Sequence, residues 1–179
     1  EKMPIKLLKA SSILWMLILV ACSNGTEEGY VNHHTTNRVE EGKMLRANRY
    51  LNKKDMLVVE GYIERHGVRM ALSDYGFYYR CVEKGGGPKI KEGSVVLYAY
   101  KIHLIDGTPL DSSGTELAQI IVDKSGGIAG LHEGLKLFSE GDSAQLIFTP
   151  HLAYGLLGDG EKIPSRATLV YDIRIKSVQ

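Results

Sequence analysis

Short strand-like runs separated by turn signals constrain the C-terminal part of the chain more than any other feature. β-Branched and aromatic residues fill four such runs, at 95–105, 120–122, 143–149 and 168–176. One stretch, 131–138, has the spacing of a short amphipathic helix, Asp106-Gly107 has the composition of a hairpin turn, and a long loop covers 150–167. Many strands with one short helix predict an α+β fold in which an antiparallel β-sheet wraps around the helix.

The region before these strands has the pattern of a helix. Apolar side chains recur every three or four residues between Glu40 and His66, and Gly67 is placed as a C-terminal stop. Asn52 could divide the segment into two helices. Its apolar positions have two open uses, which are packing against the following domain and contact with a second copy of the chain as a homodimer. We assign residues 38–67 to this helical segment and residues 68–84 to a β extension that leads into the domain.

The first 21 residues have the layout of a secretory signal peptide. Three lysines precede the apolar run 13–20, which is shorter than the roughly 20 apolar residues that a membrane-spanning helix needs. The run ends in Leu-Val-Ala-Cys22, which is similar to the lipobox of bacterial lipoproteins, where the cysteine is acylated and becomes the mature N-terminus. We therefore expect lipidation of Cys22, attachment to a membrane there, and a flexible tether over residues 22–37.

The charge balance excludes one broad class of function. The chain has 22 basic and 21 acidic residues, and cleavage before Cys22 leaves 19 and 20, a formal charge of −1. A nearly neutral chain is not expected to bind nucleic acid by neutralising phosphates.

Cysteine and histidine usage gives no sign of a cofactor. Two cysteines are too few for a disulfide framework, and if Cys22 carries lipid, Cys81 has no partner within the chain and is expected to be buried. The pair His33-His34 has no further ligand at a metal-site spacing. The sequence contains no nucleophile elbow, zinc-protease helix or Cys-x-x-Cys motif, so we expect neither a metal nor a cofactor.

Four short motifs follow one another in the strand-rich region. They are Asp106-Gly107 with Leu110-Asp111-Ser112-Ser113, Gly130-Leu131-His132-Glu133-Gly134, Ala153-Tyr154-Gly155, and Ile163-Pro164 with Ala167-Thr168-Leu169-Val170-Tyr171. Their order and spacing resemble the FK506-binding protein (FKBP) family of peptidyl-prolyl cis-trans isomerases. The resemblance implies one FKBP domain over residues 85–179. Together with the lipobox and the helical segment, it extends to envelope lipoprotein FKBPs, including ones linked to gliding motility.

The resemblance implies pocket residues position by position. The implied catalytic positions are Tyr100, Asp111, Ile128 (through its backbone N–H) and Tyr154. The implied substrate-binding positions are Leu110, Leu131, Ile163 and Tyr171. Leu110 and Leu131 stand where the family usually has phenylalanine and tryptophan, and no aromatic residue occupies 118–120, where the family has another phenylalanine. The resemblance therefore implies slower turnover than in a typical FKBP and weak binding of macrolide drugs. Without it, the apolar positions would be read as ordinary core.

An apolar pocket suits catalysis of prolyl rotation. Rotation about a peptide bond loses amide resonance across a barrier of about 18–20 kcal/mol. The planar amide is more polar than the twisted transition state, so an apolar surface destabilises the ground state more and lowers the barrier without a covalent step. We expect an isomerase of proline-containing exported polypeptides, held at the outer membrane and facing the periplasm. The alternatives are an FKBP-fold binding module with little turnover and a subunit of a motility or secretion machine.

Overall fold

The computed structural model of the chain describes residues 33–179, with side chains from residue 40 onward. The predicted signal peptide, Cys22 and most of the predicted tether lie outside these residues. In chain order the elements are α2 (His33–His66), β1 (Ala71–Leu72), β2 (Tyr78–Glu83), β3 (Val95–Leu104), β4 (Pro109–Ser112), β5 (Ala118–Ile121), α3 (Ala129–Leu135), β6 (Ser143–Phe148), the 3-10 turn η2 (Pro150–Leu152) and β7 (Leu169–Val178). Residues 45–179 form the compact unit that carries all of the strands.

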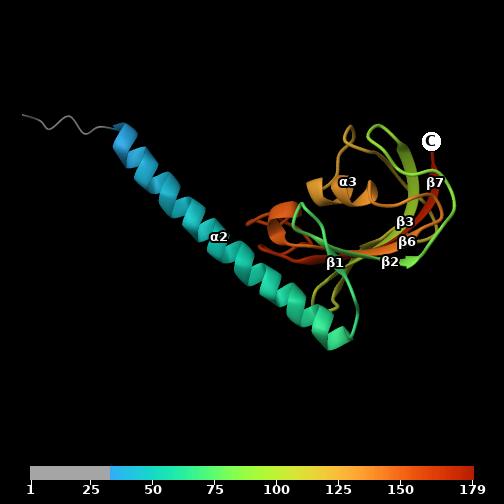
Figure 1. The fold of residues 1–179 in the computed structure, drawn as a ribbon, viewed down its shortest axis with the longest axis horizontal. Coiled ribbons are helices and arrows are strands. Elements are labelled where there is room, and N and C mark those ends of the chain that lie inside the picture. The colour runs from blue at the N-terminus through green and yellow to red at the C-terminus, as the bar shows by residue number, and fades with distance from the viewer. Residues whose placement is uncertain (1–32) are drawn as a thin grey trace, which may run out of the picture. The chain divides into compact units, whose positions relative to one another are not determined.

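A seven-stranded antiparallel sheet curls around α3 (Figure 1). The strand order is β1-β2-β6-β7-β3-β4, and β5 pairs with β3 on the same edge as β4. The strand β7 is central, because it pairs along its length with β6 on one side and with β3 on the other. The predicted α+β fold, an antiparallel sheet wrapped around a short helix and preceded by a helical segment, is confirmed.

The inner side of the sheet is closed by α3. In β7, inward side chains alternate with outward ones, and the inward buried ones are Leu169, Tyr171, Ile173 and Ile175. The outward Val170 is buried as well, in a cluster with Val59 and Tyr62 of α2. The helix can approach β6 closely because glycines face the strand. A Cβ added at Gly130 would lie 2.5 Å from the Phe148 ring, and one at Gly134 would lie 2.4 Å from Leu146. These two glycines therefore set the distance between helix and sheet.

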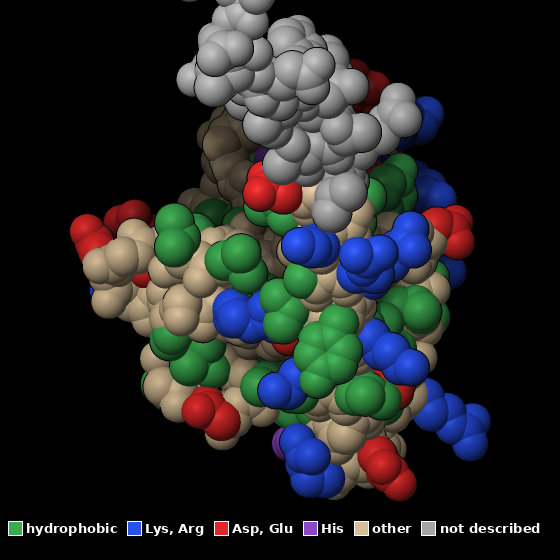
Figure 2. Space-filling view, turned by 90° about the vertical axis from the view of Figure 1, so that its left-hand side faces the viewer, with side chains coloured by type: hydrophobic (Ala, Val, Ile, Leu, Met, Phe, Trp, Pro, Cys, Tyr) green, Lys and Arg blue, Asp and Glu red, His purple; other side chains and the backbone are tan. Residues whose placement is uncertain are grey.

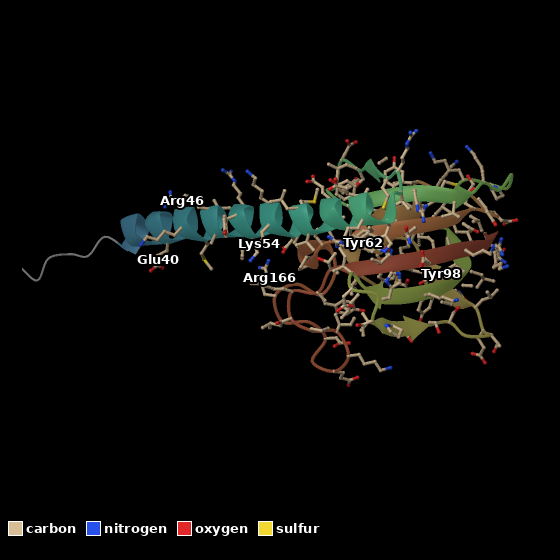
Figure 3. The ribbon with its side chains drawn as sticks, turned by 90° about the horizontal axis from the view of Figure 1, so that it is seen from below. Glu40, Arg46, Lys54, Tyr62, Tyr98 and Arg166 are labelled. Carbon is tan, nitrogen blue, oxygen red and sulfur yellow. The ribbon has the colours of Figure 1, made fainter. Side chains whose placement is uncertain are left out.

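The outer side of the same sheet is partly covered by α2. Val59 and Tyr62 are buried against Tyr78 of β2 and Ile147 of β6. The Tyr78 hydroxyl also donates to Glu60 Oε1 over 3.0 Å. Figure 3 labels Tyr62 where the helix meets the sheet. Packing against the domain, one of the two uses considered for the helix, is thus found for this part of α2.

Other apolar side chains of α2 face solvent. Leu45, Tyr50 and Leu57 are 58%, 69% and 58% exposed. Figure 2 shows hydrophobic side chains lying among lysines and arginines on one face of the molecule. Contact with a second copy of the chain stays a prediction. None of the described helices combines the length and the apolar character that crossing a bilayer requires.

Three features differ from the sequence expectations. The helix α2 begins at His33, inside the predicted tether, and continues through Asn52, because propagation past one polar residue costs little once a helix is formed. The strand β4 was not expected. Burial of Cys81 is a wrong prediction, because this thiol is exposed. The strand β1 covers β2 only opposite Tyr78 and Tyr79, and the pairing of β2 with β6 shifts register just after Cys81.

Candidate active site

Tyr100 lies on the inward face of β3. Asp111 of β4 binds its hydroxyl, and Ser113, the residue after β4, binds its backbone. Asp111 of β4 is paired opposite Ile102, which places its carboxylate diagonally across from Tyr100. The Tyr100 hydroxyl donates to Asp111 Oδ2 over 2.8 Å. The Tyr100 backbone N–H donates to Ser113 Oγ over 3.1 Å, and the Ser113 N–H donates to the Tyr100 carbonyl over 3.1 Å. The segment Asp-Ser-Ser thus fixes the position and direction of the tyrosine ring.

Tyr98, Tyr154 and Tyr171 lie close to the Tyr100–Asp111 pair, and charge interactions within this group contribute to raised tyrosine pKa values. Burial, followed by the hydrogen bond to Asp111, raises the pKa of Tyr100 to about 12. Burial also raises the pKa of Tyr171, and the nearby phenols of Tyr154 and Tyr98 raise it further. The pKa of Tyr98 is raised by burial and then by Tyr154. The hydroxyls of Tyr98, Tyr100 and Tyr171 therefore keep their protons at neutral pH and are hydrogen-bond donors.

The base of this cluster is apolar and closely packed. Ile128, Leu131 and Tyr171 are buried members of the main core cluster. The Tyr171 ring meets the Phe148 ring edge to face, with centroids 5.3 Å apart and planes at 75°. Ile128 is the N-cap of α3, and its carbonyl accepts the Leu131 N–H over 3.0 Å. Its own N–H has no acceptor among the described residues, so this donor is available to a ligand.

The loop between η2 and β7 carries Tyr154 and Ile163, and it is folded by its own contacts. Asp159 Oδ1 accepts the N–H groups of Glu161 over 2.9 Å and Ile163 over 2.7 Å, and these bonds lower the pKa of the Asp159 carboxyl. Gly158 has a φ of +76°, and a Cβ there would lie 2.1 Å from the Ile163 carbonyl oxygen. The loop therefore presents Ile163 in a defined place, while Tyr154 is 39% exposed.

The structure brings the eight sequence-predicted residues to this one region. Three are buried in the base, namely Ile128, Leu131 and Tyr171. Three more are half-buried and pack against the main core cluster to which the base belongs, namely Tyr100, Leu110 and Ile163. The two exposed ones are Asp111, bonded to Tyr100, and Tyr154, whose phenol affects the three raised tyrosine pKa values. The result is an apolar floor with a rim of hydroxyl groups, which we call the floor and the rim below.

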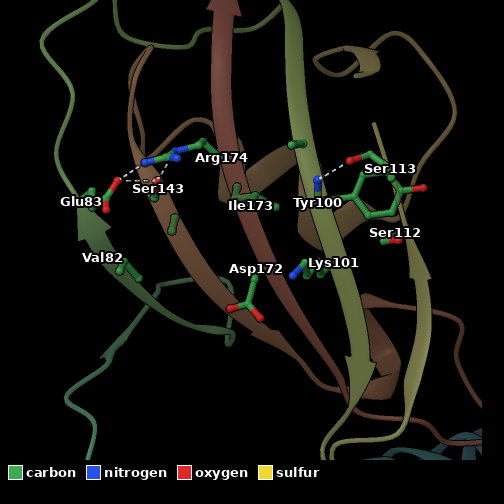
Figure 4. A pocket seen from close by; sticks show the side chains of 13 residues that line it. Val82, Glu83, Tyr100, Lys101, Ser112, Ser113, Ser143, Asp172, Ile173 and Arg174 are labelled. Atoms are coloured by element: carbon green, nitrogen blue, oxygen red, sulfur yellow. Dashed lines mark hydrogen bonds and ion pairs between the residues drawn. The ribbon is translucent and has the colours of Figure 1, made fainter. Parts of the chain in front are cut away.

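Three cavities of the described chain lie beside this cluster, and none is lined by the three floor residues. The first, of about 520 Å³, lies on the outer sheet face among Lys101, Asp172, Arg174 and other mainly polar residues (Figure 4). The second, of about 580 Å³, adjoins it at β4. The third, of about 260 Å³, lies between α2 and the loop. The outer-face cavity contains charged side chains that are paired with one another, such as Arg174 with Glu83, and it is lined by Tyr100 but by none of the floor residues.

Sequence reasoning missed Tyr98 and Phe148. Tyr98 is buried, lies 5.8 Å from the Tyr100 ring between centroids, and is paired opposite Ala118 in the β3–β5 register. The Tyr98 ring therefore lies beside Ala118, in the segment 118–120 where the sequence has no aromatic residue. The alternation of β3 could have revealed this, because Tyr98 is two residues from Tyr100 and shares its face. Phe148 gave no such signal, because its place under Tyr171 depends on the β6–β7 pairing.

His132 has a structural partner near the site. His132 is buried, and its Nδ1 accepts the Asp123 N–H over 3.0 Å, which holds Asp123 at its unusual φ of +61°. Across the described residues, no group of three His, Cys, Asp or Glu side chains is placed to hold a metal ion.

Comparison with known proteins places this geometry in a family. The sequence model of the FKBP-type peptidyl-prolyl cis-trans isomerases matches residues 86–176. The FKBP-type peptidyl-prolyl cis-trans isomerase FkpA of Escherichia coli K12 is 36% identical over 120 residues, which are 67% of this chain and 43% of that protein. Probable FkpA of Neisseria meningitidis serogroup B is 33% identical over 64% of this chain and 41% of that protein. The chain thus spans less than half the length of these relatives.

Solved structures show the same fold. The crystal structure of FkpA from Escherichia coli matches with a TM-score of 0.61 and 27% identity, over 100% of this chain and 84% of that one. A peptidyl-prolyl cis-trans isomerase from Pseudomonas syringae matches with a TM-score of 0.63 and 24% identity, over 73% of this chain and 95% of that one. The second likeness concerns the fold alone.

Proposed function

Because the chain belongs to the FKBP-type peptidyl-prolyl cis-trans isomerase family, we propose that it catalyses the cis-trans isomerisation of X-Pro peptide bonds. One observation carries the proposal, which is that the buried floor and the hydroxyl rim lie together inside the segment 86–176 that the family matches. Uncatalysed prolyl rotation takes tens to hundreds of seconds, so a modest lowering of its barrier has a large effect on folding.

The floor lowers the barrier by excluding water. An X-Pro amide placed against Leu131 and Tyr171 loses hydration, and the polar planar amide loses more than the twisted one. Fixed donors then hold the neighbouring carbonyls while the bond rotates, with the Ile128 N–H on one side and the Tyr154 hydroxyl on the other. Asp111 acts by accepting the Tyr100 hydroxyl and so fixing the rim. It is not a general base, because no proton moves in this reaction.

A refolding assay limited by prolyl isomerisation tests this proposal. The chain should accelerate the slow refolding phase of a proline-limited client, and Tyr154→Phe and Asp111→Ala should each reduce the acceleration. Tyr75→Phe is the matched control, since Tyr75 is an exposed tyrosine outside the cluster. Equal acceleration by Tyr154→Phe, Asp111→Ala and the control would refute the site.

A binding module with little turnover is the second candidate. It is favoured by the aliphatic Leu110 and Leu131 in place of aromatic residues. Flat aromatic walls contribute about 0.5–1.5 kcal/mol beyond simple burial, so their loss weakens binding of ring-containing ligands. A module of this kind would suppress aggregation of an unfolded client without changing its refolding rate, and it would bind FK506-type macrolides weakly.

We also propose that the clients are exported polypeptides and that the chain acts as a lipoprotein at the outer membrane, facing the periplasm. This rests on the basic and apolar leader and on the Leu-Val-Ala-Cys22 motif, which lie outside the described residues. Labelling of cells with a fatty-acid analogue should mark the chain, and Cys22→Ser should abolish both the label and its membrane association. Retention of the label in Cys22→Ser would refute the anchor.

The exposed apolar side chains of α2 support a further partner. We propose a homodimer through this helix, and the machine subunit named above is the competing use of the same face. Light scattering of the full chain should give a dimer mass, and Tyr50→Glu with Leu57→Glu should give a monomer. A monomeric wild-type chain would contradict the dimer.

A further inference from the structure

An ion pair joins the active-site loop to α2. Arg166, at the end of the loop, donates from Nη2 to both carboxylate oxygens of Asp55, over 2.7 Å to Oδ1 and 3.0 Å to Oδ2. The Asp55 and Arg166 side chains are 13% and 30% exposed, so the pair is screened by solvent and salt less than a surface pair. Figure 3 labels Arg166 next to α2, close to Lys54.

The backbone of Arg166 is tied to the loop at the same time. Its N–H donates to the Gly155 carbonyl over 3.3 Å, and the Gly155 N–H donates to the Pro150 carbonyl over 2.7 Å. Gly155 follows Tyr154 directly, so Arg166 links the segment that carries the rim tyrosine to α2. Arg166 also has a φ of +56°. A non-glycine residue in this region costs roughly 1 kcal/mol or more and persists only where its surroundings hold it.

A cavity lies beside the ion pair, between the loop and the helix. The cavity of about 260 Å³ lies here, and it is lined by Leu51 and Asn52 of α2 and by His151 and Leu156 of the loop region. Burial lowers the pKa of His151, and the Asp55 carboxylate opposes that shift. The ion pair thus bridges loop and helix beside this cavity.

We infer that Asp55 and Arg166 are positioning residues for the isomerase site. The pair fixes the loop against α2, and the loop in turn keeps Tyr154 and Ile163 at the rim. About one and two turns further along the same face of α2, Val59 and Tyr62 pack on the sheet, so the helix is a support to which the loop is attached. The inference rests on the proposed isomerase function for its kinetic part.

Breaking the pair should weaken substrate binding more than it slows rotation. A loose loop must be ordered each time a substrate binds, and this cost falls equally on the ground state and the transition state. We expect Asp55→Asn to raise KM about fivefold while kcat changes less than twofold, with the kinetics measured by NMR exchange on an X-Pro peptide. Tyr154→Phe, which removes a contact to the twisting amide itself, should lower kcat instead.

The variants are chosen to leave the fold intact. Asp55→Asn keeps the size of the side chain, and Arg166→Gln keeps a long polar side chain at the same backbone angle. Arg166→Lys retains the charge and should restore part of the lost affinity. The matched control is Glu83→Gln, which breaks the ion pair with Arg174 on the outer sheet face, away from the loop. The control should leave KM unchanged.

Hydrogen exchange gives a readout that does not depend on activity. In the full chain, the amides of Gly155 and Arg166 should exchange faster in Asp55→Asn than in wild type, whereas the β6 amide of Ile147 should not. If the wild-type chain has no isomerase activity but this exchange pattern is found, the proposed function fails and the loop attachment stands. If the wild type is active and Asp55→Asn changes neither the exchange nor KM, the inference is overturned.

Discussion

The close approach of α3 to β6 at Gly130 gives a prediction whose sign can be worked out from distances. A Cβ at Gly130 would lie 2.5 and 2.8 Å from two ring carbons of Phe148 and 3.1 Å from the Leu152 carbonyl oxygen, where 3.4 Å or more is ordinary contact. An aromatic ring and a backbone oxygen cannot move aside cheaply. Gly130→Ala should therefore overpack the core, at a typical cost of about 1–3 kcal/mol.

Helix propensity acts in the opposite direction. Replacing glycine by alanine inside a helix stabilises it by roughly 0.5–1 kcal/mol. The net effect of Gly130→Ala is then a loss of about 1 kcal/mol of unfolding free energy. Because Phe148 packs edge to face on Tyr171 of the floor, the same substitution should also reduce isomerase activity.

Two other glycines in helices provide matched controls. At Gly134 the added Cβ would meet the end of one side chain, Leu146 Cδ2 at 2.4 Å, and no backbone oxygen, so we expect a smaller cost there. At Gly61 it would meet only the Arg65 guanidinium at 3.1 Å, so Gly61→Ala should be stabilising. Urea unfolding of the three variants should rank them Gly61→Ala, Gly134→Ala and Gly130→Ala, from most to least stable. A Gly130→Ala protein as stable as Gly61→Ala would refute the packing argument.

Three further predictions concern Tyr100, Tyr98 and Cys81. The Tyr100 pKa of about 12 exceeds the ordinary value of 10, so its contribution to stability is complete below pH 10 and is lost between pH 10 and 12; Asp111→Asn should lower this pKa in an ultraviolet absorbance titration, and an unchanged titration would contradict the bond. Tyr98→Ala should open space beside Ala118, lower the free energy of unfolding in urea by about 3 kcal/mol and reduce activity. If Tyr98→Ala lost no more unfolding free energy than Tyr98→Phe, the ring would not be needed there. Cys81 should react with a thiol reagent in the native chain, and protection until unfolding would contradict its exposed position.

The sequence was informative wherever local pattern decides structure. Strands at 95–104, 143–148 and 169–178 agree closely with the runs of β-branched and aromatic residues, and Gly67, with a φ of +62°, ends α2. Several motif residues lie where local pattern fixes direction, such as Leu131 at the start of α3 and Tyr171 near the start of β7.

Long-range features were not predictable in the same way. Nothing in the composition of α2 reveals that Asp55 meets Arg166, because the partners are 111 residues apart and the contact requires the helix to lie on the outer sheet face. The short strand β4 has only four residues and contains a proline, so it lacks the alternation that marks longer strands. Exposure of Cys81 depends on how far β1 extends along β2, which is a property of the assembled sheet.

The central place of β7 has a consequence for biogenesis. Its partners β6 and β3 precede it in the chain, so during synthesis or translocation they have no shared neighbour until residue 178 has emerged. Such a topology delays cooperative folding to the last moment, since pairings distant in sequence are slow to form. If the chain is exported as proposed above, this order keeps the sheet incomplete until the last strand has crossed the membrane.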